Sequence, residues 1–150
     1  MELVKSRAYR SDAAAESAQA TLALALSVQL RLFAPVLPFV TEEVWSWWQS
    51  GSVHRAAWPV AAELPAGGDP AIVTAATEAL AGVRKAKSDA KVSMRADVQT
   101  ATIIAPAEQA AAVEAVRSDL VDSGRIAELS VLAGTGPLTV QVVLAPVDEG

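Results

Sequence analysis

The feature that most constrains the fold of this chain is a change in hydrophobic period near residue 97. Upstream, apolar residues recur every three or four positions, which is the spacing of an amphipathic helix. Downstream they recur at every second position, most regularly at Leu138, Val140, Val142 and Leu144. Because the side chains of a strand alternate between its two faces, these four residues would line one side of a sheet. The change predicts an α+β fold, with helices first and a small sheet after them.

The second half of the chain is predicted to have the order α-β-α-β-β. Asp69 followed by Pro70 is a typical helix start, because proline lacks the amide hydrogen that the first turn leaves unbonded. Pro106 opens a second helix, and Gly124 ends it. The buried positions expected in these two helices are Ile72, Ala76, Leu80, Val83, Val113, Val116 and Leu120. Strands are expected at 98–104, 126–132 and 138–144, with Gly134, Gly136 and Pro137 in the turn before the last.

The first half is predicted to be helical. Asp12 is a typical N-cap for a helix over 13–33, a stretch made almost entirely of helix-forming residues. We expect this helix to lie in the core of a bundle, with a buried stripe of Leu22, Leu26, Leu30 and Phe33. Pro35 and Pro38 end it, and they also interrupt the apolar stretch 22–40 before it could cross a membrane.

A further helix is predicted after the two prolines. Thr41 is its expected N-cap, and Glu42 and Glu43 would lie in its first turn, where the helix dipole favours carboxylates and no catalytic role is needed to explain them. The helix would run to Gly51. It carries three tryptophans, Trp45, Trp47 and Trp48. They cannot all point to one face, and packing in the core or between domains is favoured for them over stacking on bases.

These patterns divide the chain into three segments. We expect a partial helical bundle over 1–60, a linker rich in alanine, glycine and proline over 61–68, and a small α/β subdomain over 69–150.

The composition excludes several kinds of chemistry. Cysteine is absent and His54 is the single histidine, which excludes thiolate zinc sites, cysteine nucleophiles and multi-histidine metal sites. The net charge is −5, so any binding to nucleic acid must be local. No basic-then-apolar leader opens the sequence, and we expect a soluble, cytoplasmic protein without a membrane partner.

One segment carries a specific family resemblance. Residues 30–45, LRLFAPVLPFVTEEVW, resemble the helix–proline–helix signature of the anticodon-binding bundle of class I aminoacyl-tRNA synthetases. Two flanking segments narrow the resemblance to valyl-tRNA synthetases: ELVKSR at 2–7, and GSVHRAAWP at 51–59, where Ala57 replaces a proline that is usual in that family. Residues 83–98 are similar to the helix and basic turn that precede the family's terminal sheet. The resemblance covers most of the chain and weakens after residue 97.

The resemblance implies the C-terminal, tRNA-binding part of an enzyme that joins valine to its tRNA with ATP and magnesium. The family's catalytic motifs and its editing domain are absent, so this part is not expected to be catalytic or to hold a cofactor. Residues 85–88 resemble the family's KMSKS-like motif only superficially, since no Rossmann unit surrounds them. Met1 would fall in the middle of the bundle, which suggests a fragment or a truncated paralogue. The implied partners are valine-specific tRNA and the rest of the synthetase chain.

The candidate tRNA contacts form a local basic cluster. Five cations lie within 84–95, where Asp89 is the single acid. These candidates are Arg84, Lys85, Lys87, Lys91 and Arg95. Three of them, at 84, 87 and 91, would share one face if the helix continues, and that face could bind phosphates of the anticodon stem-loop. A solvated helix face with a Lys85–Asp89 pair explains the same residues, and the sequence leaves both interpretations open.

Two further candidates lie in the connector that follows the tryptophans. Trp58 could form an exposed platform for a base, and His54 could contact RNA. A lone histidine before a turn is more commonly a hydrogen-bonded connector residue. Arg31 is expected to pair with Glu42 or Glu43 across the proline bend.

The leading hypothesis is therefore tRNA recognition, with the helical half holding the anticodon stem-loop and the α/β half closing over it. The alternative is a structural or protein-interaction module that self-associates as a homodimer through the cut face of the bundle. A stand-alone enzyme finds no support in a chain with one histidine, no cysteine and no phosphate loop. Cations that turned inward or paired with carboxylates would remove the RNA role assigned to them.

Overall fold

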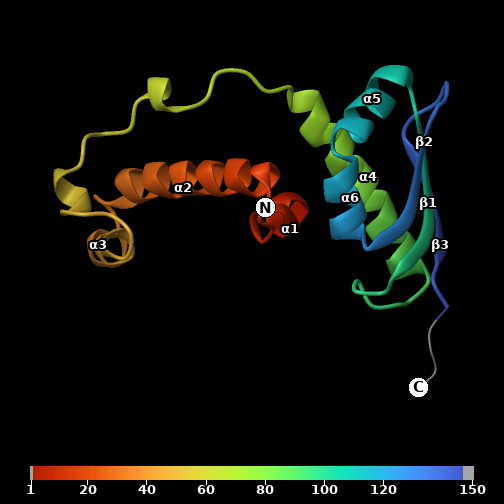
Figure 1. Ribbon diagram of the computed structural model, residues 1–150, viewed down its shortest axis with the longest axis horizontal. Helices are drawn as coiled ribbons and strands as arrows, with labels where there is room; N and C mark the ends of the chain where they lie inside the picture. Colours follow the sequence, from red (N-terminus) through yellow and green to blue (C-terminus); the bar gives the residue numbers. More distant parts are fainter. Residues whose placement is uncertain (1, 147–150) are drawn as a thin grey trace. The chain divides into compact units, whose positions relative to one another are not determined.

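A computed structural model describes residues 2–146 of the chain. The chain divides into two compact units (Figure 1). Ala8–Gly67 forms the helical unit, and Met1–Arg7 together with Gly68–Gly150 forms the α/β unit. This division differs from the expected one, which placed the first seven residues in the bundle. No helix among residues 2–146 combines the length and the apolar composition that crossing a bilayer requires.

The helical unit is built on α2 (Ala13–Phe33) and α3 (Pro38–Ser46), followed by the short 3₁₀ turns η2 (Val53–Arg55) and η3 (Ala61–Glu63). Asp12 is the N-cap of α2, as predicted, because its side chain accepts a 2.8 Å hydrogen bond from the amide of Ala15. The predicted buried stripe is confirmed fully only at Leu30. Leu22 is half-buried, and Leu26 and Phe33 are exposed.

The start and end of α3 differ from the prediction. Pro38 is its first residue, so Thr41 lies one turn inside the helix, buried, with its hydroxyl bonded to the carbonyl of Leu37 at 2.8 Å. Glu42 and Glu43 consequently lie beyond the first turn. The helix ends at Ser46, before the second and third tryptophans. Pro38 stands at the first helical position, where the amide hydrogen that it lacks is not needed, and Leu37 is the N-cap in place of the predicted Thr41.

The three tryptophans face different surroundings, as expected. Trp45 is buried in a small core with Leu30, Ala34 and Val53. Trp47 is 69% exposed and Trp48 is 38% exposed. The core position predicted for the tryptophans is therefore confirmed for Trp45 alone.

The α/β unit carries α4 (Pro70–Asp89), β1 (Val98–Ala105), α5 (Ala107–Ala115), α6 (Arg117–Gly124), β2 (Ile126–Ala133) and β3 (Thr139–Leu144). The sheet order is β2-β1-β3, with β1 parallel to β2 and antiparallel to β3. The three helices cover one face of the sheet (Figure 1). The predicted α-β-α-β-β order is confirmed, except that the second helix breaks at Val116, whose φ of −117° interrupts it.

The core of the α/β unit lies between these helices and the sheet. Its buried members include Leu80, Val83, Ile103, Val113 and Leu120. The alternation expected in β1 shifts near its start, because the pairing with β3 has a bulge between positions 98 and 100. Such an irregularity changes the side-chain parity of a strand, which explains why Val98, Ala101 and Ile103 are all buried.

The first residues of the chain belong to this unit through two contacts. Leu3, in the short turn η1 (Glu2–Val4), packs against the core. Arg7, in α1 (Lys5–Ala8), forms an ion pair with Asp119 of α6, and its Nε donates to that carboxylate at 3.0 Å. Asp119 is only 1% exposed. A buried carboxylate needs a charged partner, and the sequence contained no local signal for a pair 112 residues apart.

Candidate nucleic-acid interface

Lys87 is buried, so the prediction that it shares an exposed helix face with Arg84 and Lys91 is wrong. Its side chain is 1% exposed, and its ammonium donates to the carbonyls of Gly124 at 2.8 Å and Met94 at 3.2 Å. The residue continues the buried stripe of α4 one turn beyond Val83, where α4 packs against α6. Burial lowers the pKa of the Lys87 ammonium, and the nearby charge of Arg125 lowers it further.

Lys85 is accounted for by a local ion pair. Its ammonium lies 2.9 Å from a carboxylate oxygen of Asp89, four residues on, and both side chains are exposed. This is the pairing that the solvated-face interpretation predicted. Exposed pairs of this kind contribute little to stability, so Asp89 can be exchanged for another anion at small cost.

Lys91 lies in the turn that ends α4, where it adopts a left-handed conformation. The helix ends at Asp89, and the φ of Lys91 is 55°. The amide of Lys91 donates to the carbonyl of Ser88 at 2.9 Å, and the amide of Val92 donates to the carbonyl of Lys87 at 3.1 Å. These two bonds form a Schellman motif, in which the left-handed position is usually glycine. Lys91 therefore places a cation at a position where the backbone conformation favours glycine.

Three of the five candidates remain free of internal ion pairs. Arg84, Lys91 and Arg95 are exposed, and no ion pair involves them among residues 2–146. They flank the end of α4 and the turn that follows it. We call Arg84, Lys85, Lys91 and Arg95 the basic turn. The structure thus reduces the predicted five-residue cluster to four accessible cations, one of which is paired.

Trp58 and His54 belong to the helical unit. Trp58 is 59% exposed, as a platform for a base would require. His54 is exposed too, but its Nε2 lies 3.1 Å from the carbonyl of Pro38 and its amide bonds to the hydroxyl of Ser52 at 3.2 Å. His54 therefore holds the connector against the start of α3, which was the more common role expected of it.

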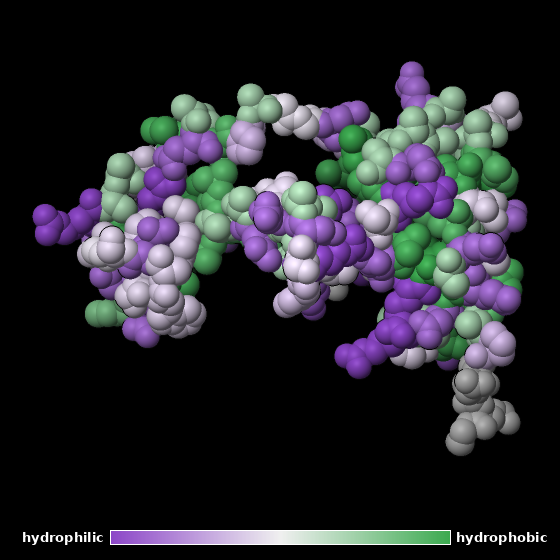
Figure 2. Space-filling model, in the orientation of Figure 1, coloured by the Kyte–Doolittle hydropathy of each residue, from purple (hydrophilic) through white to green (hydrophobic). Residues whose placement is uncertain are grey.

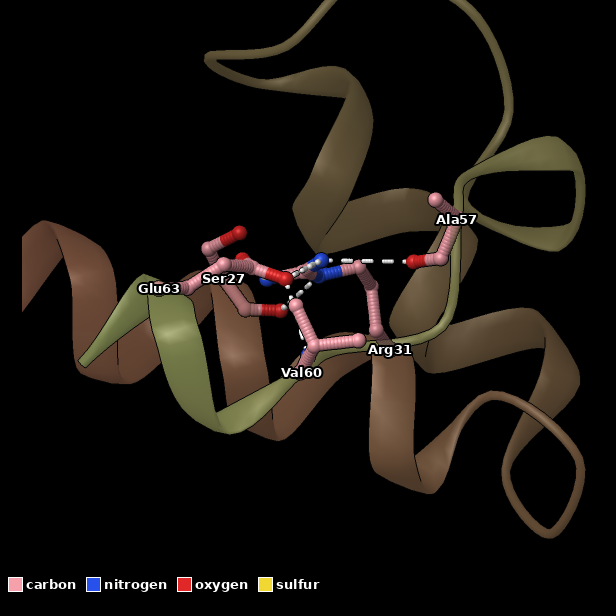
Figure 3. Close-up of polar contacts among 5 residues, drawn as sticks. All are labelled: Ser27, Arg31, Ala57, Val60 and Glu63. Carbon is pink, nitrogen blue, oxygen red and sulfur yellow. Dashed lines mark hydrogen bonds and ion pairs between the residues drawn. The ribbon is translucent and has the colours of Figure 1, made fainter.

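Arg31 pairs with Glu63, and the expected pair with Glu42 or Glu43 is wrong. Figure 3 shows its guanidinium between the carboxylate of Glu63 and two backbone carbonyls. Nη1 lies 3.1 Å from Oε1 of Glu63 and 3.2 Å from the carbonyl of Ala57, and Nε donates to Ser27 at 3.2 Å. Hydrogen bonding with Glu63 raises the pKa of Arg31, and the same bond lowers the pKa of Glu63.

The two carboxylates expected near Arg31 have other partners. Glu42 accepts hydrogen bonds from the hydroxyl of Ser52 at 2.9 Å and the amide of Val53 at 3.0 Å. Glu43 accepts from the indole of Trp47 at 3.2 Å. Both acids therefore have structural partners within the helical unit. Among residues 2–146, no group of three or more histidine, cysteine or acidic side chains is placed to hold a metal ion.

Apolar surface is present on both units, where Figure 2 shows hydrophobic residues in green beside hydrophilic ones in purple. In the helical unit the most exposed large hydrophobic side chains are Phe39 at 88%, Tyr9 at 81% and Val36 at 74%. Where such side chains form a contiguous patch, the patch commonly marks a surface that contacts a partner.

Comparison with known proteins places these features in a family. The family model described as "Anticodon-binding domain of tRNA ligase" matches residues 1–103, which include the helical unit, α4 and the basic turn. The valine–tRNA ligase of Thermobifida fusca is 50% identical over 154 residues, covering 99% of this chain and 17% of that protein. The valine–tRNA ligase of Cutibacterium acnes is 48% identical over 148 residues, covering 96% of this chain and 17% of that protein. The enzyme of Leifsonia xyli is 47% identical over 152 residues, covering 99% and 18%.

The chain therefore spans less than one fifth of the length of these relatives. It is homologous to the C-terminal region of valine–tRNA ligases. With a family match over more than two thirds of its residues, this chain belongs to the anticodon-binding domains of tRNA ligases.

Proposed function

We propose that this chain binds valine tRNA for a valine–tRNA ligase, holding the tRNA while a catalytic domain elsewhere in the longer protein attaches valine. The family match over residues 1–103 carries this proposal, since it includes the helix and turn where the accessible cations gather. In the whole enzyme we expect ATP and magnesium at that separate catalytic domain, and a cytoplasmic location. The contribution of this part is binding energy and positioning.

The basic turn is the proposed contact with the RNA backbone. A chain with a net charge of −5 repels RNA over most of its surface, so a local group of cations has to supply the attraction. Arg84, Lys91 and Arg95 are free to bind phosphates, and Lys85 can exchange Asp89 for one. Lys87 is left out of this contact because its ammonium is buried.

Trp58 and His54 are proposed as a second contact, on the helical unit. The exposed indole of Trp58 offers a face on which an unpaired base can stack. His54 stands four residues earlier and is fixed by its bond to Pro38, so it would contact RNA through the ring edge that this bond leaves free.

Filter binding tests the proposal with valine tRNA and a tRNA for another amino acid, each at two salt concentrations. We expect tighter binding of valine tRNA and a steep fall with salt, since each phosphate contact adds roughly 0.7–0.9 to the slope of log K against log salt. The variant Lys91→Gln/Arg95→Gln should bind more weakly and lower that slope. Weak, equal retention of both tRNAs that the double variant leaves unchanged would contradict the proposal.

A matched control changes the net charge equally without touching the basic turn. The variant Ala71→Glu/Thr74→Glu also lowers the net charge by two, at exposed positions near the start of α4. It should bind tRNA nearly as well as the unchanged chain. If both double variants weaken binding to the same extent, overall charge and not the basic turn governs the affinity.

The exposed apolar side chains of the helical unit favour a second candidate, a homodimer through that unit. The family match gives no support to the alternative function of a self-associating structural module. Dimerisation is nevertheless a separate property, and light scattering at several concentrations tests it. A monomeric mass at every concentration would contradict the proposed homodimer. A dimer whose mass Phe39→Ser leaves unchanged would contradict an interface through the helical unit.

A further inference from the structure

A groove of about 760 Å³ runs along one side of the C-terminal half of α4, within the α/β unit. Six residues of the helix line it at the spacing i, i+3, i+4, i+7, i+8 and i+11 from Thr77, so they belong to one helix face. Leu3 of η1 and Met94 of the turn after α4 complete its lining. The volume lies within the ~300–1,000 Å³ of sites that hold small organic groups.

The groove has an apolar floor and a cationic rim. Leu3, Leu80 and Met94 supply the floor, and the side chain of Met94 is 50% exposed although it is apolar. Arg84 and Lys85 stand at the rim, and among the side chains described, residues 3–146, no carboxylate lines the groove. Asp89 holds Lys85, whereas Arg84 has no ion pair within residues 2–146. The site therefore suits a flat apolar group that carries a negative charge.

We infer that this groove binds one unpaired nucleotide of the tRNA, with the base on the Leu3–Met94 floor and its phosphate on the guanidinium of Arg84. The inference rests on the proposed tRNA-binding function and assigns a subsite to it. Arginine binds phosphate oxygens through two parallel hydrogen bonds, which a single exposed guanidinium can supply. The polarisable sulfur of methionine makes favourable contacts with aromatic rings, and a base presents such a ring.

An unpaired nucleotide fits these features better than an acidic peptide does. A base has an apolar face and carries its phosphate a short distance away, which matches a floor and a rim on the same helix face. The groove also lies wholly within the segment matched by the anticodon-binding family, from Leu3 to Met94. Protein recognition of RNA sequence is concentrated on unpaired loop nucleotides, since these can leave the stack and enter a pocket.

Two substitutions of the same kind on the same helix test this subsite. Thr77 lines the groove and Thr74 does not; both are exposed, and each hydroxyl bonds to the carbonyl four residues earlier. Thr77→Trp should fill the groove, and Thr74→Trp is its control. The probe is a fluorescent hairpin with the sequence of the valine tRNA anticodon stem-loop, titrated with the 150-residue chain at two salt concentrations.

We expect Thr77→Trp to weaken hairpin binding about tenfold, the effect of losing one stacked base, and Thr74→Trp to leave it unchanged. The salt slope should stay the same in Thr77→Trp, because no charge is removed, and should fall by roughly 0.7–0.9 in Arg84→Gln. If Thr77→Trp does not fold, as judged by circular dichroism, Ser88→Trp fills the other end of the groove and carries the same expectation.

The outcomes separate the subsite from the proposed function. If the unchanged chain binds the hairpin and Thr77→Trp binds it equally well, the subsite is overturned and the tRNA-binding function stands. If the unchanged chain binds neither the hairpin nor intact valine tRNA, the proposed function fails first. If Thr77→Trp leaves RNA binding intact but lowers the mass seen by light scattering, the groove is a protein contact, and the nucleotide subsite is again overturned.

Discussion

The ammonium of Lys87 donates a 2.8 Å hydrogen bond to the carbonyl of Gly124, the last residue of α6. The final carbonyls of a helix have no partner within it, so this bond satisfies one of them. A second bond, to Met94, fixes the turn that carries Lys91 and Arg95. Lys87, which the sequence suggested as an RNA contact, is thus a buried residue that holds in place the turn carrying the exposed Lys91 and Arg95.

The first prediction concerns this buried lysine. Lys87→Met keeps the length and the apolar stem but leaves the carbonyls of Gly124 and Met94 without the donor they share. We expect the free energy of unfolding of the α/β unit to fall by about 1–3 kcal/mol, the penalty of an unsatisfied buried polar group. Circular dichroism during urea unfolding measures it, because none of the four tryptophans lies in this unit.

The control for this change is Lys85→Met, the same substitution two residues earlier on the same helix. It breaks only the exposed pair with Asp89 and should change stability by less than about 0.5 kcal/mol. Equal effects of the two substitutions would show that the buried hydrogen bonds do not stabilise the turn.

The second prediction concerns the left-handed position of Lys91. Lys91→Gly should raise the free energy of unfolding by up to about 1 kcal/mol, because glycine adopts a positive φ without steric penalty. The same variant should bind tRNA more weakly, with the salt slope lowered by roughly 0.7–0.9. Urea unfolding and filter binding on one sample measure both effects. A variant with both weaker binding and lower stability would indicate that the lysine acts through the fold.

The third prediction is a pH dependence in the helical unit. The hydrogen bond between Glu63 and Arg31 lowers the pKa of the Glu63 carboxyl from its ordinary value of 4.5. The folded state therefore binds a proton at Glu63 less readily than the unfolded state does. The contribution of the pair is therefore complete above pH 4.5 and is lost as the pH falls below it through the folded-state value. Glu63→Gln lacks this contribution at every pH.

Tryptophan fluorescence follows this loss selectively, since all four tryptophans lie in the helical unit. The difference in urea midpoint between the unchanged chain and Glu63→Gln should be constant near neutral pH and shrink on acidification below pH 4.5. If this difference in urea midpoint does not change with pH, the charge of the Glu63 carboxylate contributes nothing to holding η3 against α2.

The fourth prediction concerns the packing of α4 on β3. A Cβ atom added at Gly82 would meet Cγ2 of Val140 at 2.4 Å and its Cβ at 2.7 Å. Gly82→Ala should therefore destabilise the α/β unit by about 1–3 kcal/mol, although alanine favours a helix over glycine by ~1 kcal/mol. Gly136→Ala is the control, because nothing lies within 4 Å of a Cβ there. Thermal unfolding of both variants measures the difference, and an unchanged or raised midpoint for Gly82→Ala would show that β3 can shift.

Much of the fold could be predicted from local patterns. The N-cap at Asp12 and the helix start at Asp69–Pro70 were confirmed, and so was the order of helices and strands after residue 69 apart from the break at Val116. Each depends on near neighbours along the chain, since a cap, a proline or an alternating run acts within a few residues. The 30–45 segment likewise identified the family without any structural information.

The partners of charged side chains depended instead on contacts between distant segments. Arg31 meets Glu63 across 32 residues and Arg7 meets Asp119 across 112, and no local pattern distinguishes these acids from nearer ones. The same holds for the basic turn, where five cations look equivalent in the sequence. Local spacing determines the face of a helix on which a residue lies, but only the packing of α4 against α6 decided that Lys87 is enclosed while Arg84 stays exposed.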